Sequence, residues 1–235
     1  MFRWMKLELA QQRLRGYCVT VVVSALSMLA FLYGMAALPH VEPEDADAAL
    51  FGHYDFLLGM TDILMMSIFA ILIAVMGARF IVAAYSGQYA LWTLSCPQPR
   101  RCILAAKLTL VLGFGCGAML LCGVVTQGIF LLTAAFFSLA AEPLTVAEVL
   151  AAFAKLLVST LLAAMSAMVA LRIGWGKHSV QATIVAALVL VVLLAQVMGM
   201  TTAFAAVMAL LVVLMALPAG WALFSLVRLV DDMEV

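Results

Sequence analysis

The sequence predicts an all-helical, polytopic integral membrane protein with six transmembrane helices. Hydrophobic residues make up 68% of the 235 residues and charged residues only 10%, which is far from the composition of a soluble domain. Apolar runs of about 20 residues recur, and in hydrocarbon such runs satisfy their backbone hydrogen bonds only as helices. One transmembrane domain is expected, with spans at about residues 18–38, 57–78, 103–139, 146–171, 179–198 and 203–227.

The first apolar run, residues 18–38, follows four basic residues and is long enough to cross a bilayer. A secretory signal has a shorter apolar core. The Met35-Ala36-Ala37 segment resembles a cleavage site, which leaves a cleavable signal as the alternative. The acidic loop 39–55 contains no Lys or Arg, and it is expected outside the cell.

The second and third spans enclose a mixed segment. The second run, residues 56–78, ends at Arg79, and a long apolar stretch then covers residues 102–141. That stretch exceeds the need of one span and is short for two. It is therefore interpreted as one long tilted or broken helix, whose irregular outer part is expected at Gln127, Gly128 and Thr133.

The remaining spans have clear boundaries. Thr145 and Glu148 have the spacing of a capping box, which predicts the start of the fourth span. A short turn at 198–202 is expected between the fifth and sixth spans. With these boundaries, eleven of the twelve Lys and Arg residues fall on one side, and eight of the twelve Asp and Glu residues lie at or near the other. The positive-inside rule then places both termini in the cytoplasm.

Several kinds of chemistry are missing from the sequence. There is no P-loop, so ATP hydrolysis is not expected on this chain. No metal-ligand motif or recognisable pair of catalytic groups occurs, and no bound cofactor or metal is expected. The net charge of zero excludes a globally basic nucleic-acid binder.

Two ionisable residues interrupt the spans, Asp62 and Lys155. Lys155 has three candidate environments. Its ammonium can extend to the outer interface or pair with Glu148 on the same helix face. Alternatively, it meets Asp62 or an anionic cargo group between the spans, which would make Asp62 and Lys155 an intramembrane polar pair.

Gly113 and Gly117 form a GxxxG pattern on the third span. Small residues at this spacing allow two helices to approach closely. The partner helix is either another span of the same chain or a span of a second subunit.

The most informative segment lies between the second and third spans. Tyr85, Tyr89 and Trp92 follow a spacing of four and three residues, so a helix here would carry an aromatic stripe that ends before Pro97. Such a helix suits either the membrane interface or a partner protein.

This segment resembles the cytoplasmic loop of the type-two family of ABC export permeases. The matching residues are Gly87, Leu91, Leu94, Pro97, Arg100 and Lys107. Gln88 stands where the family has Thr, and no Glu precedes the Gly. The resemblance implies that residues 85–96 form a coupling helix for a separate ATPase subunit, and that residues 1–15 form an interfacial helix.

The resemblance also implies partners and a location. The partners would be an ABC ATPase subunit, which binds ATP and magnesium, and a second permease copy or a paralogue in the lipid bilayer. The place would be a bacterial cytoplasmic membrane. The substrate would be amphipathic or hydrophobic, because short permeases of this family often serve antimicrobial-peptide immunity or drug export. Two alternatives are a non-transporting membrane assembly or scaffold protein and a haem-exporter-like permease, although no His lies within a span to bind haem.

Overall fold

The computed structural model describes residues 15–41, 53–83, 100–137, 146–201 and 205–232. These residues contain six long α-helices, one short π-helix and no strand. The elements are α2 (Arg15–Val41), α3 (Tyr54–Gly77), η2 (Ala78–Val82), α5 (Arg100–Phe137), α6 (Val146–Gly176), α7 (Val180–Thr201) and α8 (Ala205–Asp232).

Within the described residues, six helices are long and apolar enough to cross a membrane. The prediction of an all-helical, polytopic membrane protein is confirmed to this extent. The expected interfacial helix over residues 1–15 falls almost entirely outside the described residues, since α2 begins at Arg15.

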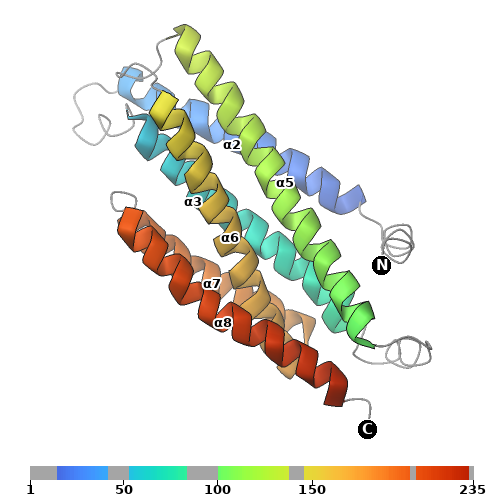
Figure 1. Cartoon of the computed structure of the whole chain (residues 1–235). Helices are drawn as coiled ribbons and strands as arrows, with labels where there is room; N and C mark the ends of the chain where they lie inside the picture. The colour runs from blue at the N-terminus through green and yellow to red at the C-terminus, as the bar shows by residue number, and fades with distance from the viewer. Residues whose placement is uncertain (1–14, 42–52, 84–99, 138–145, 202–204, 233–235) are drawn as a thin grey trace.

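The helices form one bundle in which α3 and α6 lie in the middle. The α2–α5 pair packs on one side of them and the α7–α8 pair on the other (Figure 1). The direction alternates from each helix to the next, so the start of α2 and the end of α8 lie at the same end of the bundle. Among the spans, α3 is the most buried and α8 the least.

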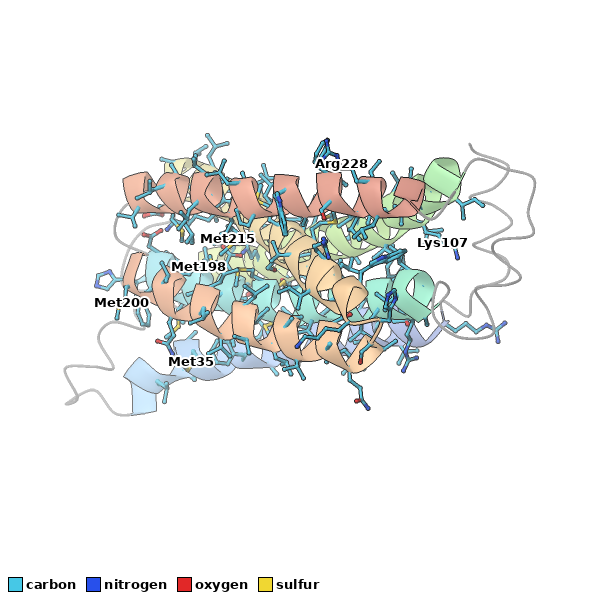
Figure 2. The ribbon with its side chains drawn as sticks, turned by 90° about the horizontal axis from the view of Figure 1, so that it is seen from below. Met35, Lys107, Met198, Met200, Met215 and Arg228 are labelled. Atoms are coloured by element: carbon cyan, nitrogen blue, oxygen red, sulfur yellow. The ribbon has the colours of Figure 1, made fainter. Side chains whose placement is uncertain are left out.

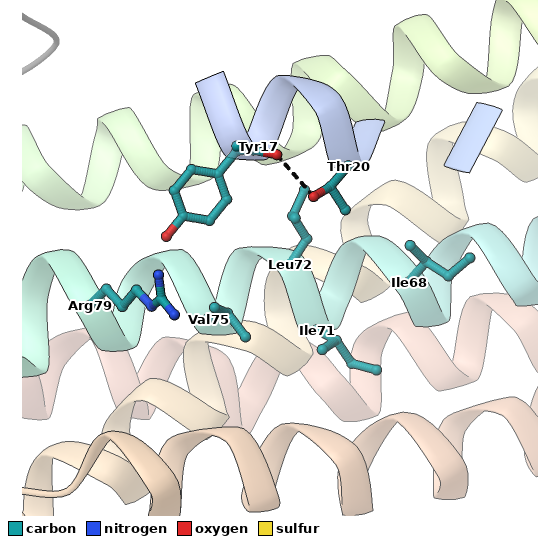
Figure 3. A pocket seen from close by; sticks show the side chains of 8 residues that line it. Tyr17, Thr20, Ile68, Ile71, Leu72, Val75 and Arg79 are labelled. Atoms are coloured by element: carbon teal, nitrogen blue, oxygen red, sulfur yellow. Dashed lines mark hydrogen bonds between the residues drawn. The ribbon is translucent and has the colours of Figure 1, made fainter. Parts of the chain in front are cut away.

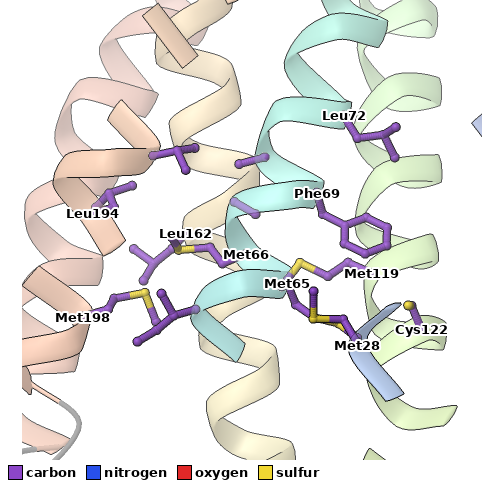
Figure 4. Packing of buried hydrophobic residues seen from close by; sticks show 14 of the residues in the cluster. Met28, Met65, Met66, Phe69, Leu72, Met119, Cys122, Leu162, Leu194 and Met198 are labelled. Atoms are coloured by element: carbon purple, nitrogen blue, oxygen red, sulfur yellow. The ribbon is translucent and has the colours of Figure 1, made fainter. Parts of the chain in front are cut away.

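Methionine fills much of the centre of the bundle. Met65 and Met66 of α3 are buried against Met119 of α5 and Met198 of α7, and Phe69 lies beside them (Figure 4). The flexible thioether side chain adapts to irregular gaps between helices. These methionines therefore belong to the interior packing and not to an exposed binding surface.

Two helices differ from their expected course. α5 is one continuous helix that runs through Gln127, Gly128 and Thr133, where an irregular segment was expected. The hydroxyl of Thr133 donates to the carbonyl of Ile129 at 3.0 Å, and such local bonds let a polar residue remain in a helix. Similarly, α7 remains helical to Thr201, past the start of the expected turn at 198–202.

The sharp turn between α6 and α7 depends on backbone geometry. His178 has a φ of 46°, and the amide of Ser179 donates to the carbonyl of Gly174 at 3.2 Å. A Cβ atom at Gly174 would overlap the Thr183 side chain. The two helices thus approach closely because position 174 has no side chain.

Candidate functional site

The candidate coupling helix is not among the described residues. Eight of the residues predicted to contact the ATPase lie within the segment 84–99, and only the backbone of Arg100 is described, as the first residue of α5. The segment connects η2 to α5 at the end of the bundle where α2 begins and α8 ends (Figure 1). The eight residues are Tyr85, Gly87, Gln88, Tyr89, Leu91, Trp92, Leu94 and Pro97.

Basic side chains gather at this end of the bundle. We call it the basic end, and Lys107 and Arg228 mark it in Figure 2. Arg172 of α6 donates from Nε to the Ser225 hydroxyl of α8 at 2.6 Å, and its guanidinium lies over the ring of Trp221. These contacts fix α8 to α6. Six basic residues whose side chains are described lie at or near this end: Arg15, Arg79, Lys107, Arg172, Lys177 and Arg228.

A cleft of about 540 Å³ opens between α2 and α3 near the basic end. Tyr17 and Thr20 line it from α2, and Leu72 and Val75 line it from α3, with Arg79 at its end (Figure 3). The Tyr17 ring also packs edge-on against Phe80 of η2. The cleft thus combines an aliphatic wall with one phenol and one guanidinium.

Asp62 is deeply buried between α3 and α5. Its side chain is 2% exposed and that of Gln127 is 1% exposed, and Gln127 Nε2 donates to Asp62 Oδ1 at 2.7 Å. Among the described residues, Asp62 Oδ2 and Gln127 Oε1 have no hydrogen-bond partner. A carboxyl group inside a membrane bundle is costly to keep there and is a candidate functional group.

Lys155 has a different partner from those considered in the sequence analysis. Its Nζ atom lies 2.7 Å from Oδ1 of Asp55, with relative side-chain exposures of 28% for Lys155 and 72% for Asp55. Asp62 instead bonds Gln127. Because Asp55 precedes Asp62 by seven residues on α3, about two helical turns, Lys155 binds the outer of two carboxyl groups on one helix face.

The GxxxG pattern makes no close helix contact within the described part of the chain. A Cβ atom at Gly113 or Gly117 would meet nothing within 4 Å. Both residues line an apolar groove of about 420 Å³ between α2 and α5. Close packing within the chain occurs instead at Gly115 against Ile73 and at Gly123 against Leu156.

The sequence interpretation missed three features of these regions. Gln127 was expected only to disturb a helix, Asp55 was treated as a loop residue, and the π-helical turn at Ala78–Val82 was not expected. The seven-residue spacing of Asp55 and Asp62 was the available signal for a shared helix face. No group of three His, Cys, Asp or Glu side chains able to hold a metal occurs in the described part of the chain.

Comparison with other proteins gives no match, whether with models of known protein families, with curated proteins or with solved structures.

Proposed function

We propose that this chain is the membrane-spanning permease subunit of an ABC exporter, powered by a separate ATPase subunit. The observation that carries the proposal is that η2 ends and α5 begins at the basic end (Figure 1). The segment 84–99, which joins these two elements in the sequence, holds the residues that resemble the coupling loop of type-two export permeases. An ATPase docked at that end would also lie near the start of α2 and the end of α8.

The charge distribution supports a cytoplasmic basic end. Six basic residues with described side chains lie there, whereas Asp55 and Glu148 lie in the first turns of α3 and α6 at the opposite end. Positively charged residues favour the cytoplasmic side of a membrane. In this orientation the beginning of α2 and the end of α8 face the cytoplasm of a bacterial cell, in whose cytoplasmic membrane the protein resides.

The open Gly113 and Gly117 groove supports pairing of permease subunits. Each subunit supplies six spans, and a complete exporter needs a second copy or a paralogue. Among the described residues, a Cβ atom at Gly113 or Gly117 would meet nothing within 4 Å, and small residues at such positions let a helix of another subunit approach. ATP and magnesium bind to the ATPase partner, whose closure moves the coupling helices and, through them, the spans as rigid bodies.

The cleft at Tyr17 and Arg79 supports an amphipathic or hydrophobic substrate that enters from the inner leaflet. Its walls are aliphatic apart from a phenol, a hydroxyl and a guanidinium near the basic end. An apolar chain with a polar or anionic end matches this arrangement, as an antimicrobial peptide or an amphipathic drug would.

The test is co-purification of the tagged chain with a candidate ATPase in mild detergent. Trp92→Ala and Leu91→Glu change the proposed coupling helix, and Lys177→Ala is the matched control at the same end of the bundle. We expect both loop variants to lose the ATPase and its stimulated ATP hydrolysis while Lys177→Ala retains both. Thermal unfolding checks that all variants remain folded. Absence of an ATPase with the wild-type chain would instead support an assembly or scaffold protein.

Labelling with a membrane-impermeant thiol reagent tests the orientation. In a cysteine-free background, His53→Cys should react in intact cells, whereas Lys177→Cys should react only after the cells are opened. The reverse pattern would place the basic end outside and contradict the proposed ATPase contact.

A further inference from the structure

The contact between Asp62 and Gln127 has one donor too few if Asp62 is ionised. An ionised carboxylate has only acceptor atoms, whereas the Gln127 amide contributes an NH₂ donor and a carbonyl acceptor. One bond is formed, from Gln127 Nε2 to Asp62 Oδ1 at 2.7 Å. The two remaining oxygens, Asp62 Oδ2 and Gln127 Oε1, are both acceptors, and neither has a partner among the described residues.

A single proton removes this deficit. With a proton on Oδ2, the carboxyl group becomes a donor and its second oxygen remains an acceptor. A neutral carboxylic acid and a primary amide can then form two hydrogen bonds with each other, because each group presents one donor and one acceptor side by side. A second bond would then run from Asp62 Oδ2 to Gln127 Oε1, and both otherwise unsatisfied oxygens would gain a partner.

The surrounding charges are also consistent with a neutral Asp62. The nearby cation, Lys155 of α6, is bonded to Asp55 at 2.7 Å; its positive charge favours an ionised Asp62 from a distance, but its ammonium forms no bond to that carboxyl group. The other charged or titratable groups described at this end are Asp55, Tyr54 and His53 at the start of α3, Glu148 at the start of α6 and Tyr33 of α2. A buried carboxylate without a bonded cation is strongly disfavoured in the interior of a membrane protein.

We infer that Asp62 and Gln127 form a proton-binding site inside the bundle. At neutral pH, Asp62 is a carboxylic acid whose Oδ2 proton is donated to Gln127 Oε1. The proton comes from water at the end of the bundle that carries Asp55 and Lys155. When it leaves, the carboxylate loses one hydrogen bond and the Lys155 ammonium becomes its nearest available counter-ion. The inference does not depend on the proposed transport activity.

Infrared spectroscopy of the full chain in lipid nanodiscs tests this protonation state. The spectrum of wild type at neutral pH is compared with Asp62→Asn, which keeps the shape of the side chain, and with Asp55→Asn as the matched control on the same helix. We expect a protonated-carboxyl carbonyl band that is lost in Asp62→Asn, retained in Asp55→Asn and shifted in heavy water. In Gln127→Leu the band should remain and move to higher frequency, because its hydrogen bonds to the amide are gone.

The spectrum of Asp62→Asn is subtracted from that of wild type at neutral pH. If this difference spectrum contains only carboxylate bands, the inference is overturned. A carboxylate band that changes with sodium concentration would also overturn it, because a metal ion would then occupy the two oxygens. If Asp62→Asn does not fold, carbon-13 labelling of aspartate in the wild-type chain replaces it. One carboxyl signal should then stay protonated at a pH where the exposed aspartates are ionised, and its absence would contradict the proposal.

Discussion

Gly115 of α5 lies so close to Ile73 of α3 that a methyl group added at position 115 would overlap the Ile73 side chain. Gly123, two turns further along α5, has the same relationship with Leu156 of α6. The close approach of α5 to the centre of the bundle therefore depends on these two glycines. Gly113 and Gly117 lie on a different face of α5, toward an open groove.

Gly115→Ala and Gly123→Ala should each destabilise the folded chain. The added methyl group forces a shift of a packed side chain, which costs about 1–3 kcal/mol. Thermal unfolding in detergent measures the loss. Gly113→Ala and Gly117→Ala are the controls, since neither meets an atom within 4 Å, and we expect their unfolding temperatures to stay at or above that of wild type. Equal losses at all four positions would contradict the packing described here.

Larger substitutions at the two control positions, Gly113 and Gly117, should weaken subunit pairing. If a second subunit covers the groove at Gly113 and Gly117, larger side chains such as Gly113→Leu and Gly117→Leu would prevent the close approach. Crosslinking in native membranes, followed by electrophoresis, should show less dimer for these variants at unchanged amounts of folded monomer. An unchanged dimer fraction would show that the subunits meet elsewhere.

Gln127→Leu should destabilise the bundle by about 1–3 kcal/mol, because it leaves the buried Asp62 carboxyl group without its hydrogen-bond partner. The double variant Asp62→Leu/Gln127→Leu removes both polar groups and should recover much of that loss. Chemical or thermal unfolding of the single and double variants measures the difference. A double variant less stable than Gln127→Leu would mean that Asp62 has stabilising contacts besides the amide.

Lys155→Met should have a small effect on stability, about 0.2–1 kcal/mol, because Asp55 is well exposed and its ion pair is screened by water and salt. The difference between Lys155→Met and wild type should shrink as the salt concentration rises. Asp55→Asn removes the other charge of the ion pair, and we expect it to cause a loss of stability of similar size and similar salt dependence. Loss of export by a folded Lys155→Met would contradict a purely structural ion pair and indicate that Lys155 contacts cargo.

Gly174→Ala should disrupt the turn between α6 and α7, since the new methyl group would meet the Thr183 side chain and backbone. Gly199→Ala, on the same hairpin but with nothing within 4 Å, is the control. We expect a loss of about 1–3 kcal/mol for Gly174→Ala alone. Limited proteolysis should then cut the variant near residues 177–179 faster than wild type.

Composition and the lengths of the apolar runs were enough to predict six membrane-spanning helices. The start of the fourth span was predicted from Thr145 and Glu148, and α6 begins at Val146. The continuity of α5 was harder to predict, because Gly128 and Thr133 have low intrinsic preference for helix interiors in water. In hydrocarbon, the cost of leaving backbone groups unsatisfied outweighs that preference.

The partners of the polar residues could not be predicted in the same way. Which side chain Asp62 meets depends on how α3 and α5 are rotated and displaced relative to each other, and a sequence records neither quantity. Lys155 was compatible with several acceptors for the same reason. The glycine pattern had a related ambiguity: helical spacing places Gly113 and Gly117 on one face, but it does not identify the helix that this face meets.

The links between Arg172 and Ser225, Asp62 and Gln127, and Tyr33 and Thr133 have a consequence for how the helices find their order. Lipid tails are as apolar as leucine, so burying one more aliphatic side chain hardly favours one neighbour over another. Each polar link instead joins one particular pair of helices, since in hydrocarbon its groups find few substitutes. These three contacts therefore specify which helices become neighbours among spans of similar apolar surface. Deleting one of them should produce misassembled bundles more readily than unfolded chains.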